Sequence, residues 1–487
     1  MKLAFAAYMP DEDSTVPGVI TDGNAFIPTE RGLGGAPTAV NSLLAALAAA
    51  CKGAASLTKL DGAQRFFAGT SVRLFEAGTT TWTDRSAGLP SDYTAVSYRW
   101  RFAQFGDTSL AASKENFLQS SSTGAFAAVA GAPKADIVET VNQFVFLFDT
   151  DDAGAQGNRL HSWWCSALGN AASWTPSVAT QAATGILTST PGKITAGRRF
   201  GDQVVVYKQH GMYLGSYIGP PFIWGFPEIP SDTGTFSQES VINIGTPEQP
   251  KHFFVGQRDF YVFDGSRPMS VGQGIRRKFF NDLNFDQVKL INLLHNRRHG
   301  LVYVFYPSGS STTLNACVAW NYKTGRWGVD NRSVQFAAEF ITPSLTYADL
   351  GTHYATYADF PVAPYGEAFL SGVQGQPAIF NTSNRLQVLN GLPGSAFMTS
   401  GDWGDDVNYG LLSRVKPTWI TKPATADIEC FNRASLGDAL STGPTAAMAN
   451  SRFDVLSSAR WHRVKMTLSG DFELNKLDAE VISDGQE

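Results

Sequence analysis

Two adjacent runs decide the fold of this chain: RWRFAQFG at residues 99–106 and, after one aspartate, TSLAA at residues 108–112. Aromatic and β-branched residues bounded by Gly, Asp, Asn or Pro are typical of β-strands and the turns between them. The segments QVVVY at 203–207 and MYLG at 212–215 follow the same pattern, with the turn QHG at 209–211 between them. We therefore predict a chain of short antiparallel strands in which these last two segments form a hairpin.

Runs of this kind recur along the chain, and their spacing indicates the architecture. The intervals between them are about 35–67 residues, which leaves room for three or four short strands in each. A loose repeat of about 40–60 residues is typical of a β-propeller, in which each unit is one blade. The main strands are expected to begin near residues 65, 100, 143, 203, 258, 301 and 368. A set of unrelated β-sandwich domains is the alternative.

The predicted fold is therefore all-β: a propeller of six or seven irregular blades, with an additional β layer or outer domain at the C-terminus. We place an N-terminal extended segment and the first strands at residues 1–60, and the propeller at residues 61–400. Residues 401–487 are expected to form a C-terminal β region that completes or flanks the propeller. Three repeats end in a turn followed by tryptophan, and we predict that these side chains are blade-core residues rather than ligand contacts: Trp82, Trp174 and Trp327.

Two segments are helix candidates within this β pattern. Residues 39–50 are rich in Ala and Leu, which have high helix propensity, although their apolar residues form no continuous stripe. Arg276–Leu283 is expected to form one or two helical turns, because Gly272 and Gly274 permit a sharp bend just before it.

Composition and charge limit the functional classes. The 487 residues carry a net charge of −5 and only 17% are charged, so a surface that grips nucleic-acid phosphates is not expected. The four cysteines are far apart in sequence, which excludes CxxC motifs and favours buried free thiols. The longest apolar run has nine residues, and the N-terminal apolar stretch is too short for a convincing signal peptide. We therefore expect a soluble protein that is made in a reducing cytoplasm.

The sequence contains no pattern typical of a catalytic, cofactor-binding or metal site. The acidic run Asp149–Asp152 lacks the spacing and the terminal Glu of an EF-hand, and we interpret it as a solvated loop. His295 and His299 would share one face of a helix, but the arginines between them favour a polar turn. Gly272–Gly274 lacks the third glycine of a dinucleotide-binding loop, and the nucleophile elbow and Walker A motifs are missing. We therefore predict that the chain is not an enzyme and binds no cofactor.

The segment 272–284 combines two glycines, three cations and two phenylalanines. We predict that Phe279 and Phe280 anchor a short helix on the propeller, while the cations face a neighbouring subunit or another ring. A solvated loop with a salt bridge between Arg277 and Asp282 is the alternative. The candidate interface residues are Arg276, Arg277 and Lys278.

Several motifs, taken in order along the chain, resemble those of one known family. They are YMPD at 8–11, FAGT at 67–70, TWTD at 81–84, RWRFAQFGD at 99–107, GAPKA at 131–135, GIRR at 274–277, FNDLN at 280–284, YVFYP at 303–307, YKTGRW at 322–327 and ARWHR at 459–463. Together they resemble the tail nozzle proteins of short-tailed bacteriophages and related prophages, also called tail hub or packaged-DNA-stabilising proteins. The last motif has Trp461 where that family has Tyr.

This resemblance implies a structural virion protein. Such nozzles form a six-fold ring below the dodecameric head–tail adaptor, and the propeller forms the wall of a channel through which double-stranded DNA leaves without sequence-specific binding. The implied partners are other copies of the chain in a homohexamer, the adaptor ring, and tail fibres or tailspikes. The implied location is the phage tail, after synthesis in the host cytoplasm. A propeller that binds or hydrolyses glycans as a receptor protein is the alternative.

Overall fold

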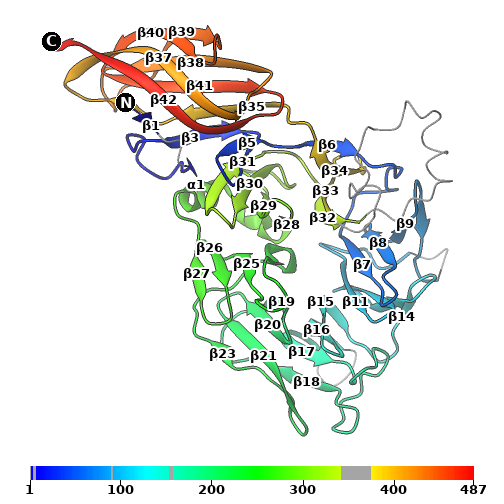
Figure 1. Cartoon of the computed structure of the whole chain (residues 1–487). Coiled ribbons are helices and arrows are strands. Elements are labelled where there is room, and N and C mark those ends of the chain that lie inside the picture. The colour runs from blue at the N-terminus through cyan, green and yellow to red at the C-terminus, as the bar shows by residue number, and fades with distance from the viewer. Residues whose placement is uncertain (1, 4–6, 89–91, 153–156, 342–374, 487) are drawn as a thin grey trace.

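The structure is a computed structural model of the chain and describes residues 2–3, 7–88, 92–152, 157–341 and 375–486 (Figure 1). β-Sheets arranged in a ring make up most of it, and a second β unit lies beside that ring (Figure 1). The helical segments of the described part are α1 (Arg276–Asp282) and the 3₁₀ helices η1 (Gln238–Ser240) and η2 (Phe285–Leu290). The predicted all-β class is confirmed.

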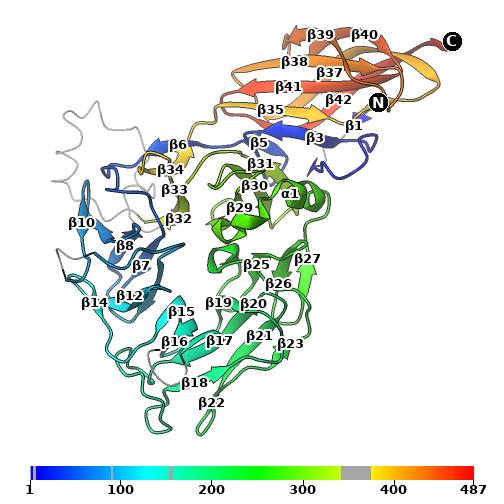
Figure 2. The same cartoon turned by 180° about the vertical axis from the view of Figure 1, so that it is seen from behind.

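Seven strands line the centre of the ring, and each contacts the next. In order they are β7 (Ala54–Thr58), β11 (Arg101–Phe105), β15 (Lys134–Val141), β19 (Ile194–Phe200), β24 (Val241–Asn243), β28 (Asn292–Asn296) and β32 (Phe336–Phe340). Because β32 also contacts β7, the circle closes (Figures 1 and 2). A closed circle of sheets around one axis is a β-propeller, which confirms the predicted architecture.

Each inner strand begins an antiparallel sheet that runs outward. The outer strands of the first group are β8 (Gln64–Gly69), β9 (Leu74–Ala77) and β10 (Trp82–Asp84), and those of the second are β12 (Thr108–Ser113), β13 (Asn116–Ser121) and β14 (Ala127–Ala128). The third group has β16 (Phe144–Asp151), β17 (Asn158–Cys165) and β18 (Ala183–Ile186). The fourth has β20 (Gln203–Lys208), β21 (Met212–Gly219), β22 (Ile223–Gly225) and β23 (Glu228–Ile229). The fifth group has β25 (His252–Val255), β26 (Phe260–Phe263) and β27 (Pro268–Ser270). The sixth has β29 (Leu301–Tyr306), β30 (Ala316–Asn321) and β31 (Arg326–Val329). The seventh has β33 (Gln376–Phe380), β34 (Leu386–Gly391) and β6 (Thr38–Asn41).

The main strands lie where the sequence predicts them in the described part of the chain. Six predicted start positions coincide with β8, β11, β16, β20, β26 and β29, while the position near 368 lies outside the described residues. The predicted hairpin is also confirmed, because Tyr207 in β20 pairs with Met212 in β21.

The number of separate blades differs from the predicted six or seven. Among the described residues, four groups form sheets of their own, those that begin with β7, β19, β24 and β32. The second and third groups are joined by the pairing of Phe117 with Lys134, and the sixth continues into the second β unit where Val329 pairs with Phe26. Sequence spacing does not reveal these junctions, because each depends on a single residue pair.

The strand β6 corrects one helix prediction. Residues 39–50 are not helical: β6 covers Thr38–Asn41 and pairs antiparallel with β34, completing the seventh group. Tertiary pairing with a strand almost 350 residues away overrides the local helix propensity of the Ala-rich run. The other helix candidate is confirmed by α1.

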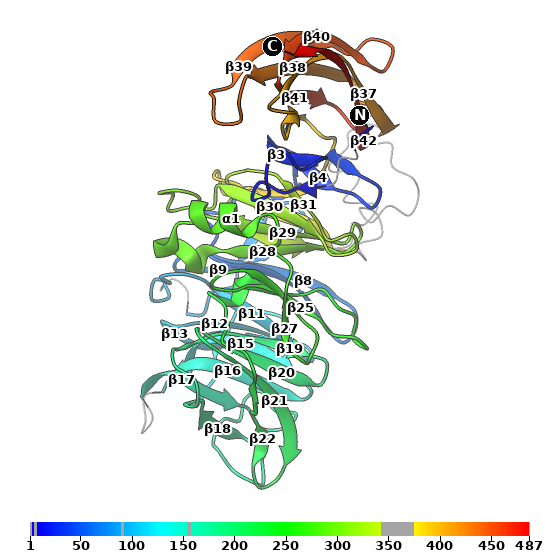
Figure 3. The same cartoon turned by 90° about the vertical axis from the view of Figure 1, so that its left-hand side faces the viewer.

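The second β unit combines both ends of the chain (Figure 3). One sheet contains β2 (Ala7–Tyr8), β3 (Val19–Asn24), β35 (Ser395–Ser400), β41 (Trp461–Ser469), β38 (Thr425–Arg433) and β39 (Ser441–Ala447), with β36 (Trp403–Gly404) beside β41. The other contains β4 (Phe26–Pro28), β5 (Leu33–Gly35), β42 (Glu473–Gln486), β37 (Asn408–Thr421) and β40 (Phe453–Ala459), with β1 (Lys2–Leu3) on β42. The N-terminal strands are thus shared between this unit and the propeller.

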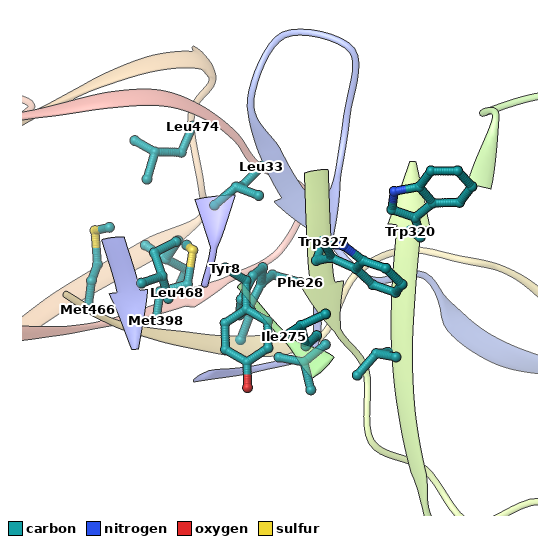
Figure 4. Packing of buried hydrophobic residues seen from close by; sticks show 14 of the residues in the cluster. Tyr8, Phe26, Leu33, Ile275, Trp320, Trp327, Met398, Met466, Leu468 and Leu474 are labelled. Atoms are coloured by element: carbon teal, nitrogen blue, oxygen red, sulfur yellow. The ribbon is translucent and has the colours of Figure 1, made fainter. Parts of the chain in front are cut away.

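The largest hydrophobic cluster joins the two parts (Figure 4). Tyr8 and Phe26 meet edge to face with ring centroids 5.8 Å apart, and Leu468 and Leu474 belong to the same cluster on the side of the second unit. On the propeller side, Trp327 lies 4.7 Å from the Phe260 ring and is 2% exposed. Burial of so many large apolar side chains at one junction stabilises the packing of the second β unit on the propeller.

Replacing Trp327 with alanine is therefore expected to lower the free energy of unfolding by about 3–5 kcal/mol, because it opens a cavity in the shared cluster. Trp82→Ala is the matched control, since Trp82 is only partly buried and should cost less when truncated. Urea unfolding of the two variants measures the difference. A loss for Trp327→Ala no larger than that for Trp82→Ala would contradict this account of the junction.

Candidate functional site

The segment around α1 folds against the N-terminal residues. Gly274 has a φ of 81°, a left-handed conformation that favours glycine, and a Cβ there would lie 3.0 Å from Cγ of Met9. The glycine therefore allows both the turn into α1 and the close approach of the N-terminal segment. The segment 8–11 and the segment 274–277, far apart in sequence, are brought together in this way.

Asp11 caps α1 from outside the helix. Its carboxylate accepts hydrogen bonds from the backbone N–H groups of Arg277, at 2.6 Å, and Lys278, at 2.8 Å. Its own backbone N–H donates to the carbonyl of Gly274 at 3.0 Å. A carboxylate at this position satisfies N–H groups that have no partner within the helix and favours the positive end of the helix dipole. The cap fixes the N-terminal segment on the propeller.

The three candidate interface cations of α1 are exposed, as an interface would require. Arg276 is 61% exposed and forms an ion pair with the buried Asp259 at 3.4 Å. Asp282 does not pair with Arg277 as the solvated-loop alternative requires; its carboxylate accepts from the hydroxyls of Tyr306, at 3.1 Å, and Ser308, at 2.8 Å.

Aromatic packing holds the inner side of the same helix. Phe279 is 1% exposed, and its ring centroid lies 4.7 Å from that of Phe260 and 4.4 Å from that of Tyr306. Phe280 is partly buried beside Phe279. These contacts are those of an anchored helix, whose outer face remains available to another molecule.

The three tryptophans predicted as blade core occupy different environments. Trp327 in β31 and Trp174 are each 2% exposed, but Trp174 lies between β17 and β18 rather than on a strand, with its indole N–H donating to the Ala171 carbonyl at 2.8 Å. Trp82 in β10 is partly buried against Phe66, with ring centroids 6.1 Å apart.

An ion-pair network crosses the propeller axis. Arg101, from β11, donates two parallel hydrogen bonds to Glu239 of η1, at 2.8 and 3.1 Å, and a further one to the carboxylate of Asp136 in β15. Arg101 and Glu239 are each 7% exposed. Burial alone would lower the pKa of the guanidinium, but the two carboxylates outweigh it and raise the pKa. Bidentate pairs of this kind have a fixed geometry, so the three blades are tied across the axis.

Two cavities lie along the axis, of about 190 Å³ and about 510 Å³. Arg101 lines the smaller one and Glu239 the larger one, so their ion pair stands between the two. Sequence reasoning missed this network. The sequence does carry one signal of it: two arginines, Arg99 and Arg101, stand at the start of a run that is rich in aromatic residues.

Several polar residues lie in an environment that differs from the one predicted from the sequence. Asp149 does not belong to a solvated loop, because it lies in β16, is 2% exposed and accepts from the Lys114 ammonium at 2.6 Å. His295 lies in β28, 3.2 Å from the Tyr322 hydroxyl, while His299 lies in the following turn. Among the described residues, no three His, Cys, Asp or Glu side chains lie together as the ligands of a metal ion would.

The cysteines are buried free thiols, as the sequence predicts: Cys51, Cys165, Cys317 and Cys430. Across the ranges that the structure describes, no helix is long and apolar enough to span a membrane.

No protein-family model and no curated protein matches this sequence. Among solved structures, the chain is similar to YCF48 from Cyanidioschyzon merolae, with a TM-score of 0.37 and 8% identity over 72% of this chain and 98% of that one. It is also similar to apo AztD from Citrobacter koseri, with a TM-score of 0.35 and 10% identity over 92% and 99% of the two chains. These distant similarities carry no information on function.

The cap on α1 predicts a specific loss of stability. Asp11→Ala is expected to lower the free energy of unfolding by about 1–2 kcal/mol, whereas Asp11→Asn should retain most of it, because Asn also caps helices well. Asp13→Ala is the matched control, since Asp13 is exposed and bonds only within its own turn, to Thr15. Thermal unfolding compares the variants, and an effect of Asp11→Ala no greater than that of Asp13→Ala would refute the capping role.

Two buried histidines predict a pH dependence. Burial lowers the pKa of His252 and of His295 to about 4, against about 6.5 in an unfolded chain. The unfolded state therefore takes up protons at these two positions more readily, so the contribution of the two histidines to stability is greatest above pH 6.5 and is lost as the pH drops from 6.5 to 4. Each histidine accounts for about 3 kcal/mol over this window.

Urea unfolding between pH 7 and pH 4.5 measures this loss. His252→Gln is expected to make the pH dependence shallower, whereas His210→Gln, at an exposed position, should leave it unchanged. A stability that is constant over this range in the unmodified chain would overturn the assignment.

Proposed function

We propose that this chain is a structural virion protein, the ring subunit of a tail nozzle of the short-tailed bacteriophage type. Six copies form the homohexameric ring through which double-stranded DNA leaves, below the head–tail adaptor, and the ring docks tail fibres or tailspikes. Its location is the phage tail. The chain performs this role by shape and assembly and not by catalysis.

The observation that carries the proposal is the meeting of the nozzle-like motifs in the fold. The segment 8–11 caps and packs against 274–277, and Tyr306, from the motif 303–307, contacts Phe279 of α1. Trp327, from the motif 322–327, packs in the same cluster. Four of the ten motifs thus form one continuous region, which supports a common structural role for these four.

The filled propeller axis limits where DNA can pass. Arg101 and Glu239 close the axis with a buried ion pair, so a duplex cannot thread through a single propeller. The proposal therefore places the DNA in the middle of the ring, along outer surfaces of the six subunits. A net charge of −5 per chain suits such a wall, because a surface with few uncompensated cations does not hold phosphates.

One exposed apolar feature is consistent with contacts to neighbours. The hairpin of β21 and β22 carries Tyr217, Ile218 and Phe222, which are 43%, 57% and 75% exposed. Large apolar side chains gathered at one tip are typical of surfaces that another chain covers. A ring of identical subunits offers such a partner surface on each neighbour.

The alternative is a propeller that binds or hydrolyses glycans. The observation in its favour is the smaller axial cavity, which is lined by arginines and carboxylates. The Arg101 charge outweighs burial and lowers the pKa of Asp136, whereas burial raises the pKa of Asp149; both carboxylates are already held in ion pairs, unlike the free pair that glycoside hydrolysis uses. The nozzle is therefore the better supported proposal.

Alanine at both Arg276 and Arg277 tests the proposed interface. The double variant is expected to lose only the Arg276–Asp259 ion pair, worth about 0–1 kcal/mol at a 61% exposed arginine, because Asp11 caps α1 through backbone N–H groups that alanine retains. Its incorporation into tails should fall strongly, since truncating a desolvated interfacial arginine costs about 2 kcal/mol or more. The matched control is the double alanine variant of Arg297 and Arg298, an exposed pair in another turn.

Melting temperature and the yield of assembled tails are measured for both double variants. Normal assembly of the Arg276 and Arg277 variant would remove α1 from the interface. A loss as large in the Arg297 and Arg298 variant would show that general surface charge, rather than this helix, governs assembly.

A further inference from the structure

The smaller axial cavity, of about 190 Å³, opens at one end of the propeller, where segments from several blades converge. Its lining includes Tyr98, Arg99, Lys114, Asp149, Lys193 and Lys289. At about 30 Å³ for each water molecule, the volume corresponds to roughly six waters, which is the size of a small ion or a single sugar residue rather than of a polymer.

Arg99 is a buried cation without a carboxylate partner in the described part of the chain. It is 3% exposed; its guanidinium donates to the carbonyls of Leu290, at 3.0 Å, and Gln335, at 3.4 Å, and lies 4.6 Å from the centre of the Phe336 ring. Its Nε has no hydrogen-bond partner. A buried charge is costly unless it is paired, so this arrangement requires a reason.

Five cations and three carboxylates line the cavity: Glu115 accepts from the backbone N–H of Ser97 at 3.1 Å, while Asp136 and Asp149 are held by other cations. Glu239, whose charge acts on Arg99, gives both its oxygens to Arg101, which also holds Asp136. Asp149 is held by Lys114, at 2.6 Å, and lies 3.6 Å from the Lys193 ammonium. The Asp149 backbone adopts a φ of 53°, which is uncommon outside glycine and recurs at binding sites. The protein thus leaves Arg99 unneutralised.

Lys289 is a second cation at this cavity without an ion pair in the described residues. Its ammonium lies 4.3 Å from the centre of the Tyr98 ring, and Tyr98 is 42% exposed. An exposed aromatic ring beside the Lys289 ammonium, in a cavity that Arg99 also lines, offers an apolar face together with donors for negatively charged oxygens. This combination suits a small molecule that has a compact anionic group.

We propose that this axial cavity is a binding site for a small oxyanion, either free phosphate or the carboxylate of an acidic sugar, held by Arg99 and Lys289 beside Tyr98. The anion supplies the counter-charge that Arg99 lacks. The Tyr98 ring covers the rest of the ligand when it is a sugar. The site does not depend on assembly into a ring, so its test is separate from that of the nozzle.

Isothermal titration of the full-length chain with inorganic phosphate, glucuronate and glucose tests the site. Saturable binding of phosphate or glucuronate, but not of glucose, is expected. Tighter binding of glucuronate would assign an acidic sugar as the ligand, and binding of phosphate alone would assign the free ion. Absence of binding by both anions at millimolar concentrations, or equal binding of glucose, would overturn the proposal.

Three variants identify the residues responsible. Arg99→Lys keeps the charge but removes the planar guanidinium, and it is expected to weaken anion binding at least tenfold, because hydrogen bonds to charged groups are the strong ones. Lys289→Gln should weaken it at least fivefold and serves if Arg99→Lys does not fold. Lys134→Gln is the matched control, since Lys134 also lies beside an aromatic ring, 5.2 Å from that of the 45% exposed Phe117, but is not among the residues that line the cavity.

The control variant should bind within twofold of the unmodified chain. An affinity that is unchanged in both Arg99→Lys and Lys289→Gln would place the anion elsewhere and contradict the proposal. An equal loss in Lys134→Gln would mean that the anion responds to overall charge, which contradicts it as well.

Discussion

The propeller depends on the pairing of β6 with β34, because this is the contact that completes the last sheet of the ring. The two strands lie almost 350 residues apart in sequence, so the seventh sheet is complete only when the N-terminal strand is in place, beside the contact of β32 with β7 that closes the circle. The same N-terminal segment also pairs with β35 through β3 and caps α1 through Asp11. One short stretch of sequence therefore locks the ring, the second β unit and the helix that bears the candidate interface.

Charges inside the ring complement this closure. Arg101, Glu239 and Asp136 come from three blades and satisfy one another across the axis, where an unpaired charge would be strongly destabilising. The axis is thereby divided into two cavities and cannot serve as a conduit. In the proposed nozzle, the DNA runs through the centre of the ring of subunits, and each propeller with its closed axis forms part of the surrounding wall. Arg99 lies outside this network and has no carboxylate partner in the described residues. The small cavity is therefore lined by a charge that the described part of the protein does not pair.

Much of the fold could be predicted from the sequence, because strand periodicity and turn residues are local signals. The hairpin across residues 209–211 and the helix after Gly274 were both found in this way. The strand β6 was missed, since its partner lies almost 350 residues away and its Ala-rich surroundings favour a helix. The sequence predicts a solvated position for Asp149, because no residue near it in sequence indicates its contacts with Lys114 and Lys193. Of the candidate site, exposed cations could be located on α1, whereas the axial network could not, because it is assembled from separate blades.

Imaging of assembled tails by electron microscopy, with the chain located by density and its copies counted, tests the central claim most directly. The account predicts six copies in one ring below the adaptor, with the DNA path at the centre of the ring and outside every propeller axis. One copy or three copies in each tail would contradict the six-fold nozzle, and so would DNA density that runs through a propeller.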